Sequence, residues 1–177
     1  MPNVIVVVPH NPNWAAAYER EATALIEIFG DALIDVHHIG STSIPNIYAK
    51  PIIDVLVETS DLNAIDSKSP AMTARGYEAM GEFGLPGRRY FRRDDAQGVR
   101  THHVHVFEKG SKSAVRHLAF RDYMIAHPES AQLYCALKRE LAPRCGTDME
   151  KYMDGKDPFI KETEVVALEW YHSRKVD

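Results

Sequence analysis

Residues 38–58 read HIGSTSIPNIYAKPIIDVLVE, and this stretch is the most informative part of the sequence for the fold. Residues 51–57 are dense in Ile and Val, which predicts a strand that is buried on both faces and therefore central in its sheet. Asp54 is the acid within that strand. Because an unpaired buried carboxylate is costly, Asp54 needs a hydrogen-bond donor, a cation or a metal. An ion pair with Lys50 or an arginine is the structural alternative to a functional role.

The turn before this strand carries residue types that a phosphate site uses. Gly40 can adopt a positive φ or let the backbone approach a ligand closely. Ser41, Thr42 and Ser43 add hydroxyls and backbone N–H donors, which suit a phosphate. Taken alone, the segment is better explained as an ordinary turn between two strands. Beside Asp54, it favours a site for a metal and a phosphate.

Length and composition describe a folded globular protein. The chain has 177 residues, of which 45% are hydrophobic and 26% charged, and these values predict one domain with a sizeable core. The net charge of -4 argues against general nucleic-acid binding. The apolar start VIVVVPH is too short for a signal peptide, and no stretch is long enough to span a membrane. From these apolar stretches we expect no membrane partner. Cys135 and Cys145 lack metal-ligand spacing, so we expect free thiols and a cytoplasmic location.

The order of the expected elements indicates an α+β fold. Strands are predicted at residues 4–8, 32–39, 51–57, 77–82 and 102–107, and helices at residues 14–29, 113–127 and 128–142. A last helix is predicted to open at Asp157 and Pro158. About residues 1–110 would then form a mixed α/β sheet core, and about residues 111–177 a helical part packed on it, within a single domain of residues 1–177.

Several of these segments resemble known proteins. The Gly40-Ser41 turn followed by the strand IDVLV is similar to the core motif of the nucleotidyltransferase superfamily. More closely, HIGSTSIP, AKPIIDVLV, RRYF, THHVHVF and LAFRDYMIAHPESAQLYCALKRELA resemble the GrpB family, which is assigned to that superfamily. The resemblance implies a nucleotidyltransferase-like mixed β-sheet with flanking helices and a C-terminal helical bundle. The resemblance indicates where a functional site lies, but it says little about which reaction takes place there.

One position departs from the superfamily pattern. A working transferase of the superfamily usually carries two acids one residue apart on this strand to hold two metals, and here the second position is Leu56. Glu58 shares the face of Asp54, but four residues of strand span roughly 13 Å. Paired metals lie only about 3.5–4 Å apart. Glu58 therefore does not replace the missing acid, and the usual two-metal mechanism is put in question.

Histidines offer a different set of metal ligands. On a strand, His103 and His105 share a face, and they converge with Asp54 if the two strands are neighbours. Two imidazoles and a carboxylate suit zinc, manganese or iron better than magnesium. The alternative is that both histidines hydrogen-bond to neighbours or contact a phosphate without a metal. We expect only such hydrogen bonds for His102, and we expect His38 to orient the turn.

The basic run GRRYFRR predicts an arginine that binds phosphate. Arginine suits this role because its guanidinium group binds phosphate with two parallel hydrogen bonds. Alternation along a strand puts Arg89 and Arg88 on opposite faces, so the whole run does not reach one ligand. We predict that Arg89 is the phosphate-binding residue.

Three lysines are open to two interpretations. Lys50 either closes over an anion or neutralises a nearby acid. Lys138 and Lys156 resemble positions of the family in its helical half, but from the sequence they are equally well explained as surface lysines.

The leading hypothesis is a metal-dependent, nucleotidyltransferase-like enzyme that acts on a nucleotide or a phosphorylated small molecule. Asp54, Arg89 and Lys50 would have catalytic roles, and residues 40–43 would bind the phosphates. A divalent metal, Mg or Mn with Zn as a further candidate, would be the cofactor.

Two alternatives come from other classes of protein. The first alternative is a catalytically silent protein that binds a nucleotide or metabolite. The presence of Leu56 in place of the second acid favours this alternative. The second alternative is a metal-dependent phosphoester hydrolase that uses His103 and His105. A homodimer is expected if an apolar helix stripe is exposed.

Overall fold

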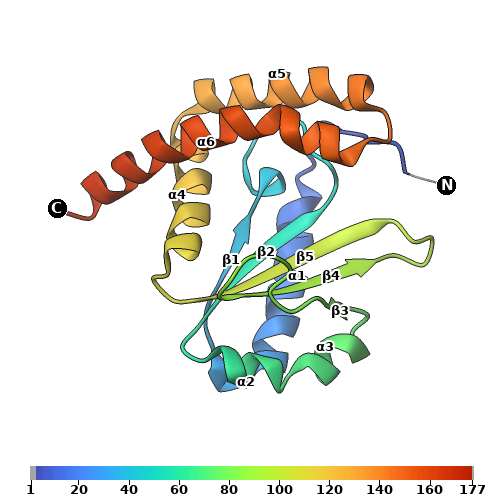
Figure 1. Cartoon of the computed structure of the whole chain (residues 1–177), viewed down its shortest axis with the longest axis vertical. Helices are drawn as coiled ribbons and strands as arrows, with labels where there is room; N and C mark the ends of the chain where they lie inside the picture. Colours follow the sequence, from blue (N-terminus) through green and yellow to red (C-terminus); the bar gives the residue numbers. More distant parts are fainter. Residues whose placement is uncertain (1–2, 177) are drawn as a thin grey trace.

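The computed structural model describes residues 3–176 as a five-stranded mixed sheet with helices on both faces (Figure 1). The helices are α1 (Asn13–Phe29), α2 (Leu62–Asp66), α3 (Ser69–Ala74), α4 (Lys112–Ala126), α5 (Pro128–Cys145) and α6 (Met149–Arg174), with 3₁₀ turns η1 (Gly30–Ala32) and η2 (Ser41–Ser43). The strands are β1 (Leu33–Ile39), β2 (Ile53–Thr59), β3 (Glu78–Ala79), β4 (Arg88–Asp94) and β5 (Arg100–Glu108). The predicted α+β class is confirmed.

The strand that carries Asp54 lies in the interior of the sheet. The strand order is β1-β2-β5-β4-β3, and β2 runs antiparallel to β1 and parallel to β5. Val55, Leu56 and Val57 of β2 are all 0% exposed, as the dense run of apolar residues predicted. The parallel register sets Asp54 opposite His103.

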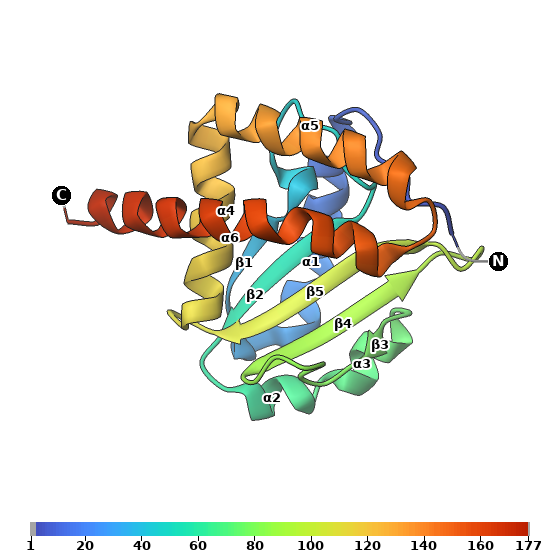
Figure 2. The ribbon, with the colours of Figure 1, turned by 45° about the horizontal axis from the view of Figure 1, so that its top comes forward.

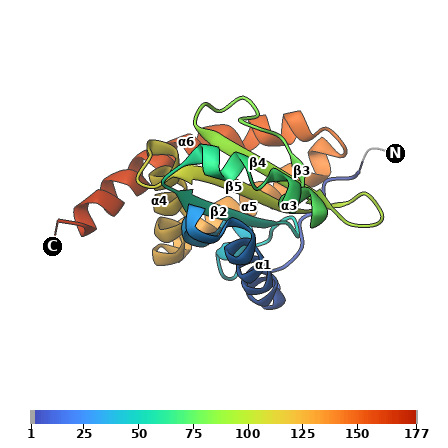
Figure 3. The ribbon, with the colours of Figure 1, turned by 90° about the horizontal axis from the view of Figure 1, so that it is seen from below.

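Alternation of side chains gives the sheet two different faces. One face carries Val55, Val57 and Val104 and packs into the main core with α1, α2 and α3. The other face carries Asp54 and His103 and lies on the side of α4, α5 and α6. Figure 3 shows α1 and α6 on opposite sides of the sheet. The functional candidates therefore lie between the sheet and the C-terminal helices.

Helices α5 and α6 run side by side, and α6 is longer than the sequence predicted (Figure 2). It is one helix from Met149, with Asp148 as its N-cap and Pro158 inside it, so the predicted start at Asp157 and Pro158 is wrong. Proline removes one backbone N–H from a helix, and the carbonyl left over belongs to Asp154, an exposed residue that water can reach. Within residues 3–176, every helix falls short of the length or the apolar character that a membrane crossing requires.

The N-terminal segment does not form the predicted strand at residues 4–8. The Ile5 N–H donates to the carbonyl of Gly146, while Val8 forms an isolated bridge with Ala49. Because these partners lie on two separate segments, no continuous ladder develops. The strand predicted at residues 77–82 is likewise reduced to the two residues of β3, paired with β4.

Candidate functional site

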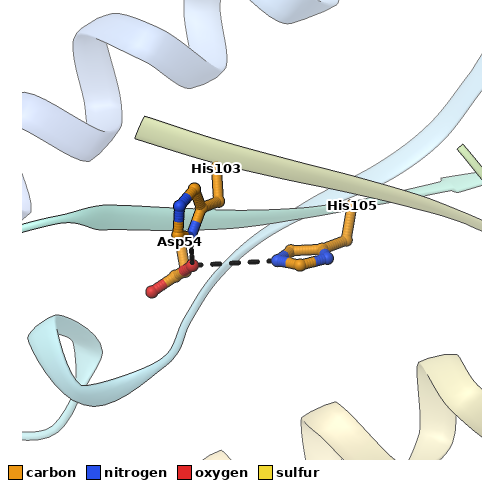
Figure 4. Close-up of side chains that lie close together, drawn as sticks. All are labelled: Asp54, His103 and His105. Atoms are coloured by element: carbon orange, nitrogen blue, oxygen red, sulfur yellow. Dashed lines mark hydrogen bonds and ion pairs between the residues drawn. The ribbon is translucent and has the colours of Figure 1, made fainter. Parts of the chain in front are cut away.

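Asp54 lies beside two histidines of the neighbouring strand (Figure 4). Nδ1 of His103 is 2.9 Å from Oδ1 of Asp54, and Nε2 of His105 is 3.7 Å from the same oxygen. One ligand atom from each of the three residues lies within 4.8 Å of the others. The convergence predicted from the sequence is therefore present. Among the ion pairs of residues 3–176, the partners of Asp54 are imidazoles, not Lys50 or an arginine.

The protonation states around Asp54 suit a metal. Burial alone raises the pKa of this carboxyl, but the interactions with His103 and His105 outweigh burial and hold its pKa below the usual range. Burial also lowers the pKa of His105, which keeps the imidazole neutral. Anionic carboxylates and neutral imidazoles are the forms that bind metals. A set of one carboxylate and two imidazoles fits manganese, zinc or iron better than magnesium.

The turn before β2 is packed directly against Asp54. Gly40 has a φ of 73°, in the region that favours glycine. A Cβ atom at Gly40 would lie 2.5 Å from Oδ2 of Asp54, which is well inside van der Waals contact. Glycine is therefore required here both by the backbone conformation and by the neighbouring carboxylate.

The hydroxyl groups of the turn make different hydrogen bonds. Thr42 donates to the carbonyl of Ile52 over 3.0 Å and pairs with Nε2 of His38, also at 3.0 Å. Ser43 donates within the turn, over 2.5 Å. His38 thus orients the turn, as predicted. Ser41 lines the cavity, where its side chain hydrogen-bonds to Tyr134.

These residues line one wall of a cavity of about 560 Å³. The opposite wall comes from the C-terminal helices, with His117 from α4, Tyr134 and Lys138 from α5, and Tyr152, Met153 and Lys156 from α6. A second, more apolar hollow of about 750 Å³ shares Phe83, Tyr90 and Met153 with this cavity. The site is therefore a chamber with several charged side chains that adjoins a more apolar groove.

Two rings hold His105 in place. Tyr90 stacks on it with ring centroids 5.2 Å apart, and His117 lies 5.7 Å away. Burial, together with the neighbouring His105, lowers the pKa of His117 to about 3, so this histidine is neutral. Nδ1 of His105 is buried without a hydrogen-bond partner in the described part of the chain. The packing of rings thus fixes the orientation of His105.

The structure places Arg88, not Arg89, at the cavity. Arg89 belongs to the opposite face of the sheet, where Nε and Nη2 lie 2.6 and 3.0 Å from the carboxylate of Asp66. Arg88 lines the cavity, with its guanidinium 5.0 Å from the ring centroid of Tyr90. The predicted alternation of faces is right, but the choice of arginine needs correction because Asp66 already binds Arg89. Lys50 does line the cavity, and burial lowers its pKa.

The position of the missing second acid belongs to the core. Leu56 is 0% exposed and packs with Phe107 and Leu118 beneath α4. Glu58 lies further along β2, where its carboxylate is 3.0 Å from Nε2 of His37. Neither residue reaches the cavity, so the ligand set at Asp54 differs from a pair of acids.

Sequence reasoning left the role of the lysines on the opposite wall undecided. Lys138 is 2% and Lys156 8% exposed, so the interpretation of both as surface residues is wrong. A signal was present in α5, because its buried residues recur at helical spacing: Ala131, Tyr134, Cys135, Lys138, Ala142 and Cys145. Lys138 occupies a position of the buried stripe. His117 and Arg88 carried no comparable signal, because only the folded chain brings them to the cavity.

Comparison with known proteins identifies relatives over nearly the whole chain. The family described as GrpB protein matches residues 4–165. The UPF0157 protein YqkA of Bacillus subtilis is 43% identical over 96% of this chain, which covers 49% of YqkA. A protein named dephospho-CoA kinase from Mycolicibacterium paratuberculosis is 26% identical over 94% of this chain, which covers 47% of that protein. The chain thus spans about half the length of these two relatives.

Solved structures show the same architecture. The crystal structure of GrpB from Enterococcus faecalis matches with a TM-score of 0.89 and 44% identity, and covers 94% of this chain and 99% of that one. Cid1, solved in complex with its short product ApU, matches with a TM-score of 0.50 and 12% identity over 75% of this chain and 42% of that one. The likeness to Cid1 concerns the fold alone. It confirms the nucleotidyltransferase-like sheet that the resemblance implied.

Proposed function

The chain belongs to the GrpB family, and from this premise we propose that it is a metal-dependent, nucleotidyltransferase-like enzyme acting on a nucleotide or a phosphorylated small molecule. The observation that carries the proposal is the convergence of Asp54, His103 and His105 at the cavity. A ligand set of this kind on a wall that faces several cations suits a metal-bound phosphate compound.

Asp54, His103 and His105 would hold the divalent cation. The cation would polarise a phosphoryl oxygen and offset the charge that develops there. Magnesium and manganese are the metals expected for phosphoryl chemistry, whereas the two imidazoles favour manganese or zinc. Gly40 keeps the turn against Asp54, so that the carboxylate has a fixed position before the substrate arrives.

Other residues of the cavity would bind and orient the substrate. Ser41 would hydrogen-bond a phosphate oxygen, and Arg88 would stabilise the charge on the transferred group, a role that the sequence assigned to Arg89. Lys50 lines both hollows and would close over the anion. The apolar groove beside Phe83 would take the organic part of the substrate.

Two features favour the alternatives. The burial of Leu56 in the core favours a protein that binds its ligand without the usual two-metal chemistry. The two imidazoles favour metal-dependent hydrolysis of a phosphoester instead. Turnover separates a silent protein from both enzymes, and the products of turnover separate transfer from hydrolysis.

The test is a titration of metal-free protein with Mn²⁺ and with Zn²⁺, in wild type and in Asp54→Asn. We expect the variant to lose about 100-fold or more in metal affinity, because it replaces an anionic ligand by a neutral amide, whereas changes to residues behind the ligands already cost about 10–100-fold. Asp66→Asn is the matched control, since Asp66 lies outside the cavity and binds Arg89. Circular dichroism confirms that each variant is folded.

The same proteins are then screened by thermal shift with nucleoside triphosphates and coenzyme A precursors, with and without metal. A ligand that binds the native state raises the apparent stability. A shift that requires both the metal and Asp54 supports the proposal. Equal metal affinity in wild type and Asp54→Asn contradicts it. A nucleotide shift that needs no metal and leads to no turnover would favour the silent protein.

A further inference from the structure

Lys138 is a buried cation without a counter-ion. It lies on the inner face of α5, is 2% exposed, and lines the cavity. Its Nζ has no hydrogen-bond partner within residues 3–176. The ring of Tyr134, with its centroid 4.5 Å from Nζ, is a weak substitute for an anion. A buried ammonium group left in this state is costly to the fold, so its presence points to a ligand.

Lys156 adds to the same wall, and Lys50, from the segment before β2, lies beside it. Lys156 is 8% exposed, and its Nζ lies 4.6 Å from the ring centroid of Tyr152. Lys50 approaches the same ring, at 5.8 Å. Asp54 is the one acid among the described residues that line this cavity, and its ion-pair partners are histidines on the sheet wall. The helical wall is therefore cationic and without carboxylates.

Like charges and burial act together on these lysines. Burial, followed by the charge of Lys156, lowers the pKa of Lys138 to about 7. Burial, followed by the charge of Lys50, lowers the pKa of Lys156 to about 8. The other groups that act on the pair are Cys135, which favours the charged form of Lys138, and Asp54, which favours that of Lys156. The pKa values of Lys138 and Lys156 thus lie near neutral pH.

We propose that Lys138, Lys156 and Lys50 form an anion subsite that binds a phosphate or pyrophosphate group. Because a bound anion favours the charged form of a neighbouring lysine, binding is accompanied by proton uptake. The subsite rests on the proposed function, because it faces the same cavity as Asp54 and names a second phosphate-binding point on the substrate. It does not depend on the metal. A substrate with a chain of phosphates would reach from the metal ligands on the sheet to the lysines of α5 and α6.

The test is calorimetric titration of metal-free protein with inorganic pyrophosphate at pH 7.5, about midway between the pKa values of Lys138 and Lys156. Titration in Tris and in HEPES, which differ in ionisation enthalpy, gives the number of protons taken up. We expect Lys138→Met to weaken binding by at least about tenfold, since it removes a charge-assisted contact. Because pyrophosphate also titrates near neutral pH, the readout is the smaller proton uptake of the variant compared with wild type.

Matched variants separate the subsite from the metal centre. Lys151→Met, at an exposed position of α6, should bind pyrophosphate as wild type does. Asp54→Asn should retain metal-free pyrophosphate binding, so a failure of the metal hypothesis leaves this proposal standing. Equal affinity and equal proton uptake in wild type and Lys138→Met would overturn the subsite, as would the absence of binding to wild type. If Lys138→Met does not fold, Lys156→Met carries the same test.

Stability without ligand provides a second readout. Lys138 has a pKa of about 7 in the fold and 10.5 in the unfolded chain, so its burial costs most below pH 7 and the cost declines as the pH rises toward 10.5. Lys138→Met should therefore raise the Tm of the free protein at pH 6.5, and the gap should narrow toward pH 9. A lysine that served the fold would instead lower the Tm when replaced, which would contradict a ligand-binding role.

Discussion

On the α1 side of the sheet, Glu21 is 3% exposed and its carboxylate accepts hydrogen bonds from Arg75, Arg93 and Tyr77. On the α5–α6 side, Lys138 is 2% exposed and has no hydrogen-bond partner in the described part of the chain. Both are buried charges in one small protein. The first is satisfied by its own fold, and the second is satisfied only if something enters the cavity.

The comparison distinguishes charges that serve the structure from charges that serve a ligand. Around Glu21, each arginine is tied to the same carboxylate, and His102 bonds to Arg93 and Thr101 as the sequence predicted. The carboxylate of Glu21 is therefore fully used within the fold.

At the cavity, Arg88 donates to the carbonyls of Glu82 and Phe83. Lys138 instead has the ring of Tyr134 beside it and no hydrogen-bond partner within residues 3–176. Burial of Lys138 is therefore unfavourable to the fold, and a bound anion would remove that cost.

The largest expected effect comes from breaking the satisfied network. Glu21→Gln should lower the free energy of unfolding by about 3 kcal/mol, because it leaves Arg75 and Arg93 without their carboxylate. Urea unfolding at pH 7 measures the change. Glu19→Gln, at an exposed position of the same helix, is the matched control and should stay within about 0.5 kcal/mol of wild type.

The same variant changes the acid sensitivity of the fold. Burial raises the pKa of Glu21, but hydrogen bonds from Arg75 and Tyr77 outweigh it and hold the pKa at about 2, against 4.5 for an unperturbed Glu. Its stabilising contribution is therefore complete above about pH 4.5 and is lost as the pH falls toward 2. Glu21→Gln should flatten this part of the stability profile. An unchanged acid profile would mean that other carboxylates govern it.

An intermediate effect is expected at the contact between the turn and Asp54. Gly40→Ala and Gly110→Ala each place a side chain at a positive φ, with an expected cost of about 1–2 kcal/mol. A Cβ at Gly110 has no atom within 4 Å, whereas one at Gly40 would overlap Asp54. Gly40→Ala should therefore destabilise the protein more in urea unfolding and also weaken Mn²⁺ binding. Equal effects of the two changes would argue against a tight contact with Asp54.

The smallest expected effect compares the two neighbouring arginines. Arg88→Met should weaken pyrophosphate binding by about three- to tenfold, the loss of one charge-assisted contact near the cavity mouth. Arg89→Met should leave binding unchanged, because Asp66 holds Arg89 away from the cavity. Calorimetric titration of both variants measures the difference. A stronger effect of Arg89→Met would return the phosphate-binding role to the residue that the sequence indicated.

Much of the sheet could be predicted because its strands follow local rules. The apolar run of β2 and the alternation in β5 gave correct strands and correct faces, and these two facts brought Asp54 and His103 together. The segment at residues 4–8 looked equally apolar but found no neighbouring strand to pair with along its length. Pro158 looked like a helix start, although packing of α6 on α4 and α5 keeps the helix continuous.

The family, the fold class, the turn at Gly40 and the carboxylate–imidazole group on two strands could all be predicted from the sequence. Strand periodicity and the conformational freedom of glycine act over a few residues, so they can be recognised in the sequence. The positions of Lys138 and Lys156 on the facing wall, of Arg88 rather than Arg89 at the cavity, and of Leu56 in the core followed only from the folded structure. Those outcomes depend on how α4, α5 and α6 lie on the sheet. The cost of burying a charge is set by its three-dimensional neighbours, not by its place in the chain.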